Sequence, residues 1–271
     1  MPTYILFLFH FSLIVLLSAG LSYFIMRWTY SPIRHKRLFD NFSGMITSGL
    51  NSGAIVLLTL GLAFVFNQIS TTHQSAKLAV LNETDALRTL GRISLNIEPD
   101  IGVPLMAATR LYTQEVIEKE WPRLSQGKSV TMHQFSVSAL PPLTAMSDIV
   151  YSPGNVAKLP SVTANQLGQL VTRIRENRLK RIDASTFTIG IRELILAIIT
   201  LASSSALLSL SLLTRAPIQL ISNFALFLVT LTAIYLAFSS QNPFSGIDSL
   251  VDTPLREALD RLNNMQLAKN L

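Results

Sequence analysis

The chain has 271 residues, of which 49% are hydrophobic and only 14% are charged. A typical soluble domain carries about 25% charged residues, so this deficit indicates a membrane protein. The sequence contains no cysteine, which excludes disulfides and thiolate metal sites. The formal net charge is +6, an excess that in membrane proteins sets orientation and lipid contact more often than it binds nucleic acid. Because no basic tract is interleaved with aromatic residues, we expect no nucleic-acid partner.

Four apolar stretches are long enough to cross a bilayer. A spanning helix needs about 20 mainly apolar residues to match a hydrocarbon core of ~30 Å. Because unsatisfied backbone groups are costly in lipid, each stretch is expected to be helical. The stretches cover about residues 4–26, 44–66, 194–213 and 218–238. In the first, the basic residues follow the apolar run, so we expect a retained helix and not a cleaved signal peptide.

A polar block, residues 67–186, separates the second stretch from the third. Apolar residues at helical spacing predict one helix over about 76–97 and another over about 104–121, with a third from about residue 163. Several prolines indicate an irregular segment over 129–161, in which a weak alternation over 130–137 fits a short strand. We expect almost no sheet.

The predicted fold class is therefore all-α: a four-transmembrane-helix membrane protein with a helical extramembrane domain inserted between spans two and three. The predicted domains are residues 1–66 with two membrane helices, 67–186 outside the membrane, 187–240 with two more membrane helices, and 241–271 as a C-terminal turn and short helix.

The link 27–43 is predicted to be cytoplasmic, because it is short and holds Arg27, Arg34, Lys36 and Arg37. A cluster of basic residues just before the third span lies on the other side of the membrane and favours the opposite orientation.

The chain leaves the last apolar stretch through the segment Asn242-Pro243-Phe244-Ser245-Gly246. The structural interpretation is a turn in which Pro243 ends the helix, Phe244 fills an apolar gap and Gly246 adopts a positive φ angle. Asp252 is then expected to cap a helix over about 254–267. The alternative is cation coordination by Asp248 and Asp252, although calcium sites use six or more oxygen ligands.

This segment resembles the one that follows the last membrane helix of bestrophins, where Asn-Pro-Phe-Gly is followed by spaced acids and Pro-Leu. Bestrophins are pentameric anion channels with four membrane spans, and in animal members the segment helps to bind calcium. Their termini are cytoplasmic, which is the opposite of the orientation predicted here from the link 27–43. Here Ser245 is inserted between the Phe and the Gly, and fewer acids follow.

The whole chain is similar to a bacterial bestrophin-like family of unknown function, which implies a multi-pass protein of the bacterial inner membrane. The resemblance is carried by residues 82–87 (Asn-Glu-Thr-Asp-Ala-Leu), Tyr112, Glu120-Trp121-Pro122, the Arg178/Arg181 segment and the closing Pro-Phe-Ser-Gly.

Small and polar residues of the second span are candidates for a pore wall or a subunit interface: Gly44, Ser48, Asn51 and Ser52. Small residues let helices approach closely, so packing within one monomer is the alternative. An amide in hydrocarbon faces protein or water, so Asn51 either bonds a neighbouring helix or joins a polar ring around a symmetry axis.

Four arginines before the third span form a candidate anion-attracting basic face: Arg173, Arg175, Arg178 and Arg181. Clustered positive charge concentrates counter-ions, and the alternative is a surface that contacts solvent or lipid headgroups.

The Glu120-Trp121-Pro122 sequence is interpreted as a structural corner, because Pro122 stops a helix and Trp121 buries a large ring. Glu115 and Glu118 share a helix face. No histidine stands at metal-ligand spacing with them, so neither a metal nor a cofactor is predicted. No catalytic triad, phosphate loop or nucleotide fingerprint is present, so we expect no enzyme.

Two functions are consistent with these patterns. The first is a homo-oligomeric, channel-like protein for small anions, with the second span nearest the axis. The alternative is a non-conducting membrane sensor or scaffold whose polar helical domain binds a ligand or a partner protein.

Overall fold

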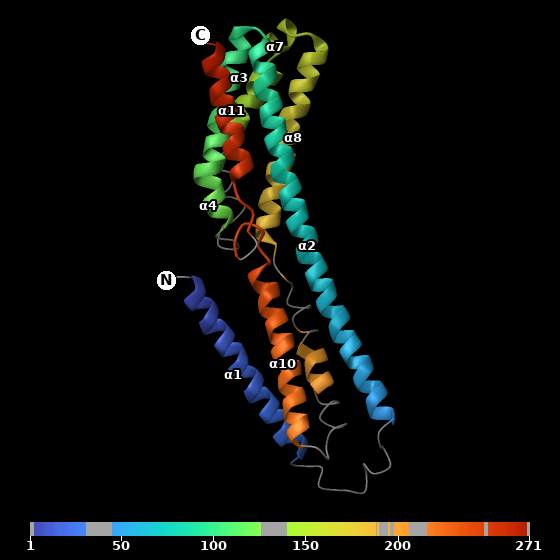
Figure 1. Cartoon of the computed structure of the whole chain (residues 1–271). Helices are drawn as coiled ribbons and strands as arrows, with labels where there is room; N and C mark the ends of the chain where they lie inside the picture. The colour runs from blue at the N-terminus through green and yellow to red at the C-terminus, as the bar shows by residue number, and fades with distance from the viewer. Residues whose placement is uncertain are drawn as a thin grey trace. The chain divides into compact units, whose positions relative to one another are not determined.

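The computed structural model describes residues 3–30, 45–125, 140–187, 189, 195, 198–205, 216–246 and 249–269. Within these ranges the fold is all-helical and contains no strand, as predicted (Figure 1). The helices are α1 (Thr3–Tyr30), α2 (Met45–Asn96), α3 (Pro99–Glu115), the π-helix η1 (Val116–Glu120), α4 (Trp121–Leu124), α6 (Leu140–Tyr151), α7 (Pro153–Lys158), α8 (Ser161–Thr186), α10 (Ala216–Ser239) and α11 (Thr253–Lys269). Residues 198–205 are also helical.

The chain divides into two compact units. Unit 1 comprises Met1–Ile69 and Ile189–Ser239, and unit 2 comprises Ser70–Thr188 and Ser240–Leu271. Helix α2 is continuous from one unit into the other. The predicted division into four blocks, and their assignment to membrane and water, stays a prediction.

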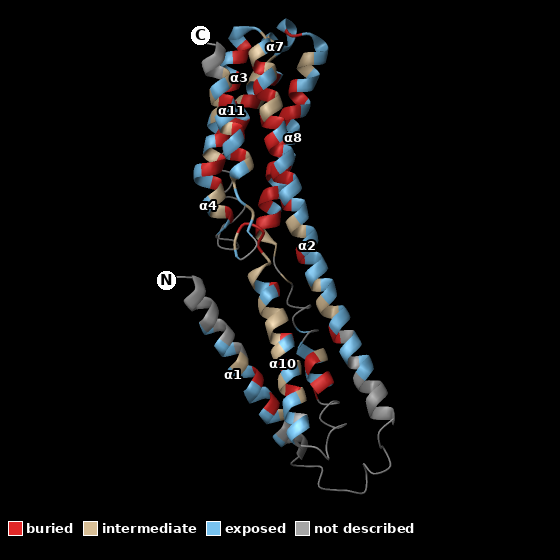
Figure 2. Cartoon of the chain, in the orientation of Figure 1, coloured by how far each residue is buried: buried red, intermediate tan, exposed pale blue. Residues whose placement is uncertain are grey.

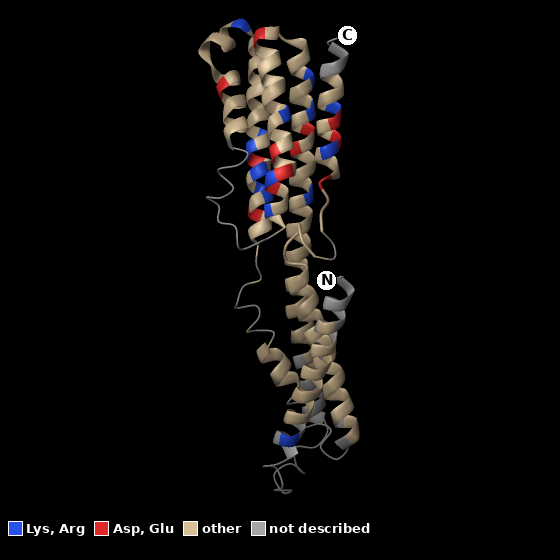
Figure 3. Ribbon diagram, turned by 90° about the vertical axis from the view of Figure 1, so that its left-hand side faces the viewer, with Lys and Arg blue, Asp and Glu red and all other residues tan. Residues whose placement is uncertain are grey.

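Unit 1 is held together by apolar contacts between α1, α2, residues 198–205 and α10. Leu58, Leu201 and Phe227 form a small core, and the Ser18 hydroxyl donates to the backbone carbonyl of Phe224 at 2.9 Å. Arg27 is the only charged residue in the described part of unit 1. Figure 3 shows most of the charged residues gathered on the helices near the C-terminus.

One helix in the described residues, Leu220–Ser239, is long and apolar enough to cross a membrane. Val15–Ile25 is a shorter apolar helix. The predicted spans 44–66 and 194–213 include residues outside the described ranges. The four-span layout therefore remains a prediction.

Unit 2 is a helical bundle with one continuous core, shown by the buried residues in Figure 2. Helix α3 packs against α6 and α11, and α6 packs against α7 and α8. Every large side chain at the centre of this core is fully buried: Leu87, Leu90, Ile101, Leu105, Tyr112, Leu143, Met146, Leu167, Ile174 and Leu255.

The connection between α2 and α3 is tight. A Cβ atom on Gly102 would lie 2.1 Å from the backbone carbonyl oxygen of Ser94, so only glycine lets the start of α3 approach the end of α2 this closely. The Ser94 hydroxyl in turn donates to the carbonyl of Leu90 at 2.8 Å.

The prediction of an irregular segment over 129–161 is wrong for its second half, where α6 and α7 form. Pro141 and Pro142 lie in the first turn of α6, and Pro153 opens α7. A first-turn N–H has no partner within the helix, so proline is tolerated there and marks a helix start. The predicted strand 130–137 lies outside the described residues.

Candidate functional site

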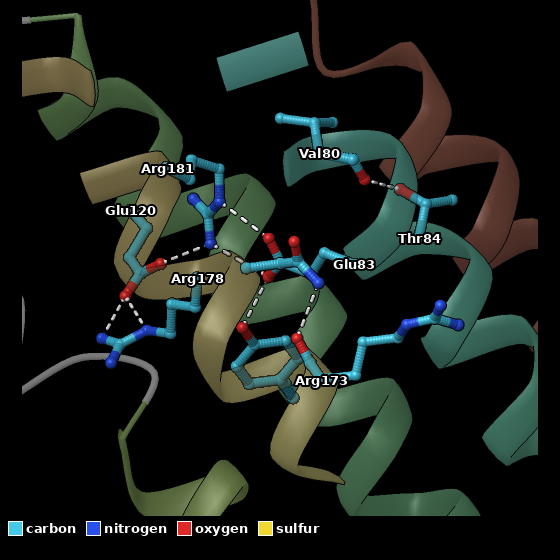
Figure 4. Close-up of polar contacts among 9 residues, drawn as sticks. Val80, Glu83, Thr84, Glu120, Arg173, Arg178 and Arg181 are labelled. Atoms are coloured by element: carbon cyan, nitrogen blue, oxygen red, sulfur yellow. Dashed lines mark hydrogen bonds and ion pairs between the residues drawn. The ribbon is translucent and has the colours of Figure 1, made fainter. Parts of the chain in front are cut away.

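Five charged or polar side chains meet in the interior of unit 2 and form what we name the buried ion-pair cluster. Its members are Glu83 of α2, Tyr112 of α3, Glu120 of η1, and Arg178 and Arg181 of α8. Arg178 is 4% exposed and the other four are 0% exposed. Three segments that are distant in sequence therefore contribute to one cluster: α2, α3 with its direct continuation η1, and α8 (Figure 4).

Arg181 lies at the centre of the cluster and bridges both carboxylates. Its Nε donates to Glu83 Oε2 at 2.9 Å, and its Nη2 donates to Glu83 Oε1 at 3.1 Å and to Glu120 Oε2 at 2.9 Å. Arg178 donates through Nε, at 2.8 Å, and through Nη2 to Glu120 Oε1. Planar guanidinium groups suit such paired donation to carboxylates.

Tyr112 completes the coordination of Glu83, because its hydroxyl donates to Glu83 Oε1 at 2.6 Å. Burial, followed by the negative charge of Glu83, raises the pKa of Tyr112 well above its ordinary value. Burial opposes the charge on Arg181, but Glu83 and Glu120 together raise the pKa of Arg181 above its usual range. Tyr112 therefore stays a proton donor and Arg181 stays a cation.

The cluster carries two positive and two negative charges and is neutral overall. Removing charges from water is costly, and their mutual attraction offsets that cost only with good geometry and additional hydrogen bonds. Among the described residues, one donor in the cluster, Nη1 of Arg181, has no hydrogen-bond partner. Removing any one of the four charged partners would leave a buried charge uncompensated, which is costly.

The π-helix η1 sets the position of Glu120. The N–H of Trp121 donates to the carbonyl of Val116, five residues earlier, so this turn is wider than an α-helical one. In an uninterrupted α-helix the ring of Pro122 would clash with the carbonyl of residue 118, which accounts for the wider turn just before it. The turn buries Val116, Ile117 and Glu120 and leaves Glu118 exposed.

The turn at residues 242–246, which we name the exit turn, is hydrogen-bonded to the end of α4. Asn242 donates from Nδ2 to the carbonyl of Leu124 at 2.9 Å, and its Oδ1 accepts from the N–H of Phe244 at 2.9 Å. Phe244 is buried edge-on against Trp121, with ring centres 5.2 Å apart and planes at 85°. Gly246 has the positive φ angle that was predicted, 94°.

Comparisons with known proteins identify this architecture. A family model described as the bestrophin-like domain matches residues 13–255. The chain belongs to the bestrophin-like family. The resemblance found in the sequence is thereby confirmed, and it covers nearly the whole chain.

Solved structures share the fold of this bestrophin-like protein at low sequence identity. A variant of a bacterial bestrophin homologue from Klebsiella pneumoniae is 12% identical with a TM-score of 0.65, covering 93% of this chain and 98% of that chain. The homologue from the same organism solved by zinc phasing has 12% identity, a TM-score of 0.61 and coverage of 93% and 97%. A variant described only as a membrane protein has 12% identity, a TM-score of 0.64 and coverage of 94% and 98%. No curated protein sequence matches the chain.

The four predicted arginines of the basic face do not lie on one surface of the bestrophin-like protein. Arg173 and Arg175 are exposed, whereas Arg178 and Arg181 point inward to the cluster. Their partners lie far away in sequence: Glu83 is 98 residues and Glu120 is 61 residues from Arg181. The run of basic residues alone therefore could not show that two of these arginines form ion pairs with distant glutamates.

Other predicted site residues are only partly described. Gly44 lies outside the described residues, Ser48 and Asn51 have described backbone but not side chains, and Ser52 is exposed in the single chain. Their assignment to a pore or an interface stays a prediction.

The weak cation candidates are not brought together by the described structure. Asp248 lies outside the described residues, and Asp252 pairs with Arg256 at 2.7 Å. Within the described part of the chain, no group of three or more acidic or histidine side chains is placed to hold a metal. The backbone carbonyl of Asp252 accepts from Leu255 and Arg256 and so begins α11, close to the predicted start.

Sequence reasoning singled out the cluster members without recognising that they meet. All five lie in segments that carry the family resemblance: Glu83 in 82–87, Tyr112 and Glu120 in one segment each, and Arg178 and Arg181 together in a fourth. The signal that could have linked them is charge balance. Two acids and two arginines lie on otherwise apolar helix faces, and buried charges are stable only when they are paired.

Replacing Tyr112 by Phe should lower the free energy of unfolding by about 1–3 kcal/mol near neutral pH, because buried Glu83 loses a donor. An unfolded tyrosine ionises near pH 10, whereas native Tyr112 keeps its proton. The stability that the wild type gains from this raised pKa is therefore lost as the pH rises above about 10.

Thermal unfolding measured from pH 8 to 11 should show the unfolding temperatures of the wild type and Tyr112→Phe converging. An equal gap at every pH would contradict this, and Tyr151→Phe, at an exposed tyrosine, is the control.

Proposed function

We propose that this bestrophin-like protein is a multi-pass, homo-oligomeric channel for small anions in the bacterial inner membrane. The observation that carries the proposal is membership of the bestrophin-like family over residues 13–255, together with a fold shared along almost the full length of bacterial bestrophin homologues.

The surface of unit 1 supports insertion into a bilayer through four spans, about residues 4–26, 44–66, 194–213 and 218–238. Phe9, Leu16 and Phe24 of α1 are 65–69% exposed, and Ile221 and Val229 of α10 are each 66% exposed. Soluble monomers rarely expose apolar side chains so densely, and such surfaces mark membrane or protein contacts. Arg27 is the only charge among the described residues of this unit.

Helix α2 is the element we assign to the pore. It has 52 residues, more than twice the roughly 20 needed to cross a bilayer, and it carries both Ser52 and Glu83. The cluster therefore anchors the same helix that supplies the proposed pore wall. Hydroxyl and amide groups at Ser48, Asn51 and Ser52 would replace the water around an anion, and exposed Arg173 and Arg175 would attract anions toward the entrance.

We place the link 27–43 in the cytoplasm on the basis of its basic residues. This orientation puts both termini on the opposite side of the membrane, the reverse of what the bestrophin resemblance implies. The lipid bilayer and further copies of the chain are the partners this function needs.

The oligomeric state tests the proposal, because a pore along a symmetry axis requires a closed ring. Native mass spectrometry of the purified, detergent-solubilised protein should give a single closed oligomer. A folded monomer under conditions that keep the protein inserted and stable would contradict the channel and favour the sensor or scaffold.

Modification of Ser52→Cys tests the pore assignment of α2. The natural chain has no cysteine, so a single introduced thiol is the only reactive one. A negatively charged thiosulfonate reagent should reduce chloride flux through Ser52→Cys oligomers in liposomes by about tenfold, because a fixed negative charge in the pore repels anions. Ile221→Cys on α10, which is also exposed in the single chain, is the control and should be unaffected. Equal effects at both positions would remove α2 from the pore.

A further inference from the structure

An open pocket of about 460 Å³ lies between α2 and the end of α8 within unit 2. Its volume falls in the range of small-molecule sites, ~300–1,000 Å³. None of its residues belongs to the buried ion-pair cluster or to the exit turn. The pocket is lined by Thr71, Thr72, Ser75, Lys180, Asp183, Ala184, Thr186 and Phe187.

The lining offers one cation and one anion that do not neutralise each other. Lys180 and Asp183 lie three residues apart on α8, and neither has an ion-pair partner within the described ranges. Four other lining residues carry hydroxyl groups: Thr71, Thr72, Ser75 and Thr186. A ligand that matches this pattern carries a negative group with several acceptor oxygens and, a short distance away, a positive group with donors.

The position of the pocket along the chain indicates which molecules reach it. Thr71 comes two residues after unit 1 ends on α2, and Phe187 comes two residues before unit 1 resumes. In the proposed membrane arrangement, Thr71 follows span 44–66 by five residues and Phe187 precedes span 194–213 by seven. Both ends of the pocket would then lie where the chain emerges into the headgroup layer.

We propose that this pocket binds the phosphoethanolamine headgroup of a bilayer lipid. Lys180 and the Ser75 hydroxyl donate to the phosphodiester oxygens, and the Asp183 carboxylate accepts from the primary ammonium. This inference rests on the membrane insertion in the proposed function but not on conduction.

Native mass spectrometry of the full-length protein in detergent, titrated with phosphatidylethanolamine and with phosphatidylglycerol of the same acyl chains, tests the site. The wild type should bind the ethanolamine lipid more tightly, because only that lipid has an ammonium for Asp183. Lys180→Met should weaken binding of both lipids by roughly tenfold or more, the effect of losing a hydrogen bond to a charged group. Asp183→Asn should abolish only the preference between the two lipids.

A second pair of variants controls for the loss of surface charge. Arg92→Met and Asp85→Asn remove one positive and one negative charge at exposed positions of α2, outside this pocket. Both should bind the ethanolamine lipid as the wild type does. All four altered side chains are exposed, so unchanged unfolding temperatures should show that the fold is kept.

Equal binding of the two lipids by the wild type, or wild-type binding by both pocket variants, would overturn the proposal. Displacement of the lipid by free phosphoethanolamine at similar concentration would also overturn it, and would assign the pocket to a soluble ligand. The assay does not require flux. A monomeric, non-conducting protein that still binds the lipid through Lys180 and Asp183 would therefore refute the channel and keep the headgroup site.

Discussion

Arg181→Met should lower the free energy of unfolding by about 3–5 kcal/mol, the range for breaking a buried ion pair by removing one partner. Methionine occupies a similar volume, so the effect comes from Glu83 and Glu120, which lose three charge-assisted hydrogen bonds inside the core. The unfolding temperature of the purified protein in detergent, followed by circular dichroism, is the measurement.

Two further variants separate charge from packing. Arg175→Met removes an exposed arginine whose hydrogen bond is to the Ser147 hydroxyl, and should cost less than about 1 kcal/mol. Adding Glu83→Gln to Arg181→Met should recover part of the lost stability, because it removes one of the stranded charges, and the double variant should therefore be non-additive. Strict additivity, or equal losses for Arg175→Met and Arg181→Met, would show that the cluster does not act as a unit.

Phe244→Ala should cost about 3–5 kcal/mol, as expected for removal of a fully packed phenyl ring. The loss combines a cavity with the edge-to-face contact to Trp121. The chain has two tryptophans, so in a Trp28→Phe background the emission reports Trp121 alone. We expect that emission to shift to longer wavelength in Phe244→Ala, because water reaches the indole ring.

Val251→Ala provides the comparison for this variant, since Val251 follows the exit turn but is 64% exposed. Its unfolding temperature and Trp121 emission should match those of the parent. If Phe244→Ala left the emission unchanged, the exit turn would not hold α4, and the interpretation of residues 242–246 as a structural clamp would be wrong.

The fold was predictable where local chemistry determines it. Apolar periodicity predicted the helix at 76–97, which is part of α2, and the third helix of the polar block. The Pro-Phe-Ser-Gly segment predicted the buried Phe244 and the positive φ angle of Gly246, because only glycine adopts that conformation easily.

The cluster was not predictable, because its contacts are between residues distant in sequence. The segment around Arg178 and Arg181 reads as an exposed basic run until Glu83 and Glu120 are brought to it by the packing of other helices. The π-turn adds to the difficulty, since it changes the face on which Glu120 lies, and the α-helical spacing used for prediction does not allow for it. The prolines were interpreted as breaking helices, but Pro141 and Pro153 lie in the first turns of α6 and α7.

Chloride efflux from liposomes containing the purified protein tests the proposed function most directly. Vesicles loaded with potassium chloride and reconstituted with wild-type protein should release chloride once a potassium ionophore is added. The ionophore lets potassium leave as well, so that no membrane potential builds up to oppose chloride efflux. Vesicles with heat-inactivated protein should retain it. Absence of release from protein verified as folded, oligomeric and inserted would contradict an anion channel and leave this bestrophin-like fold with a role other than conduction.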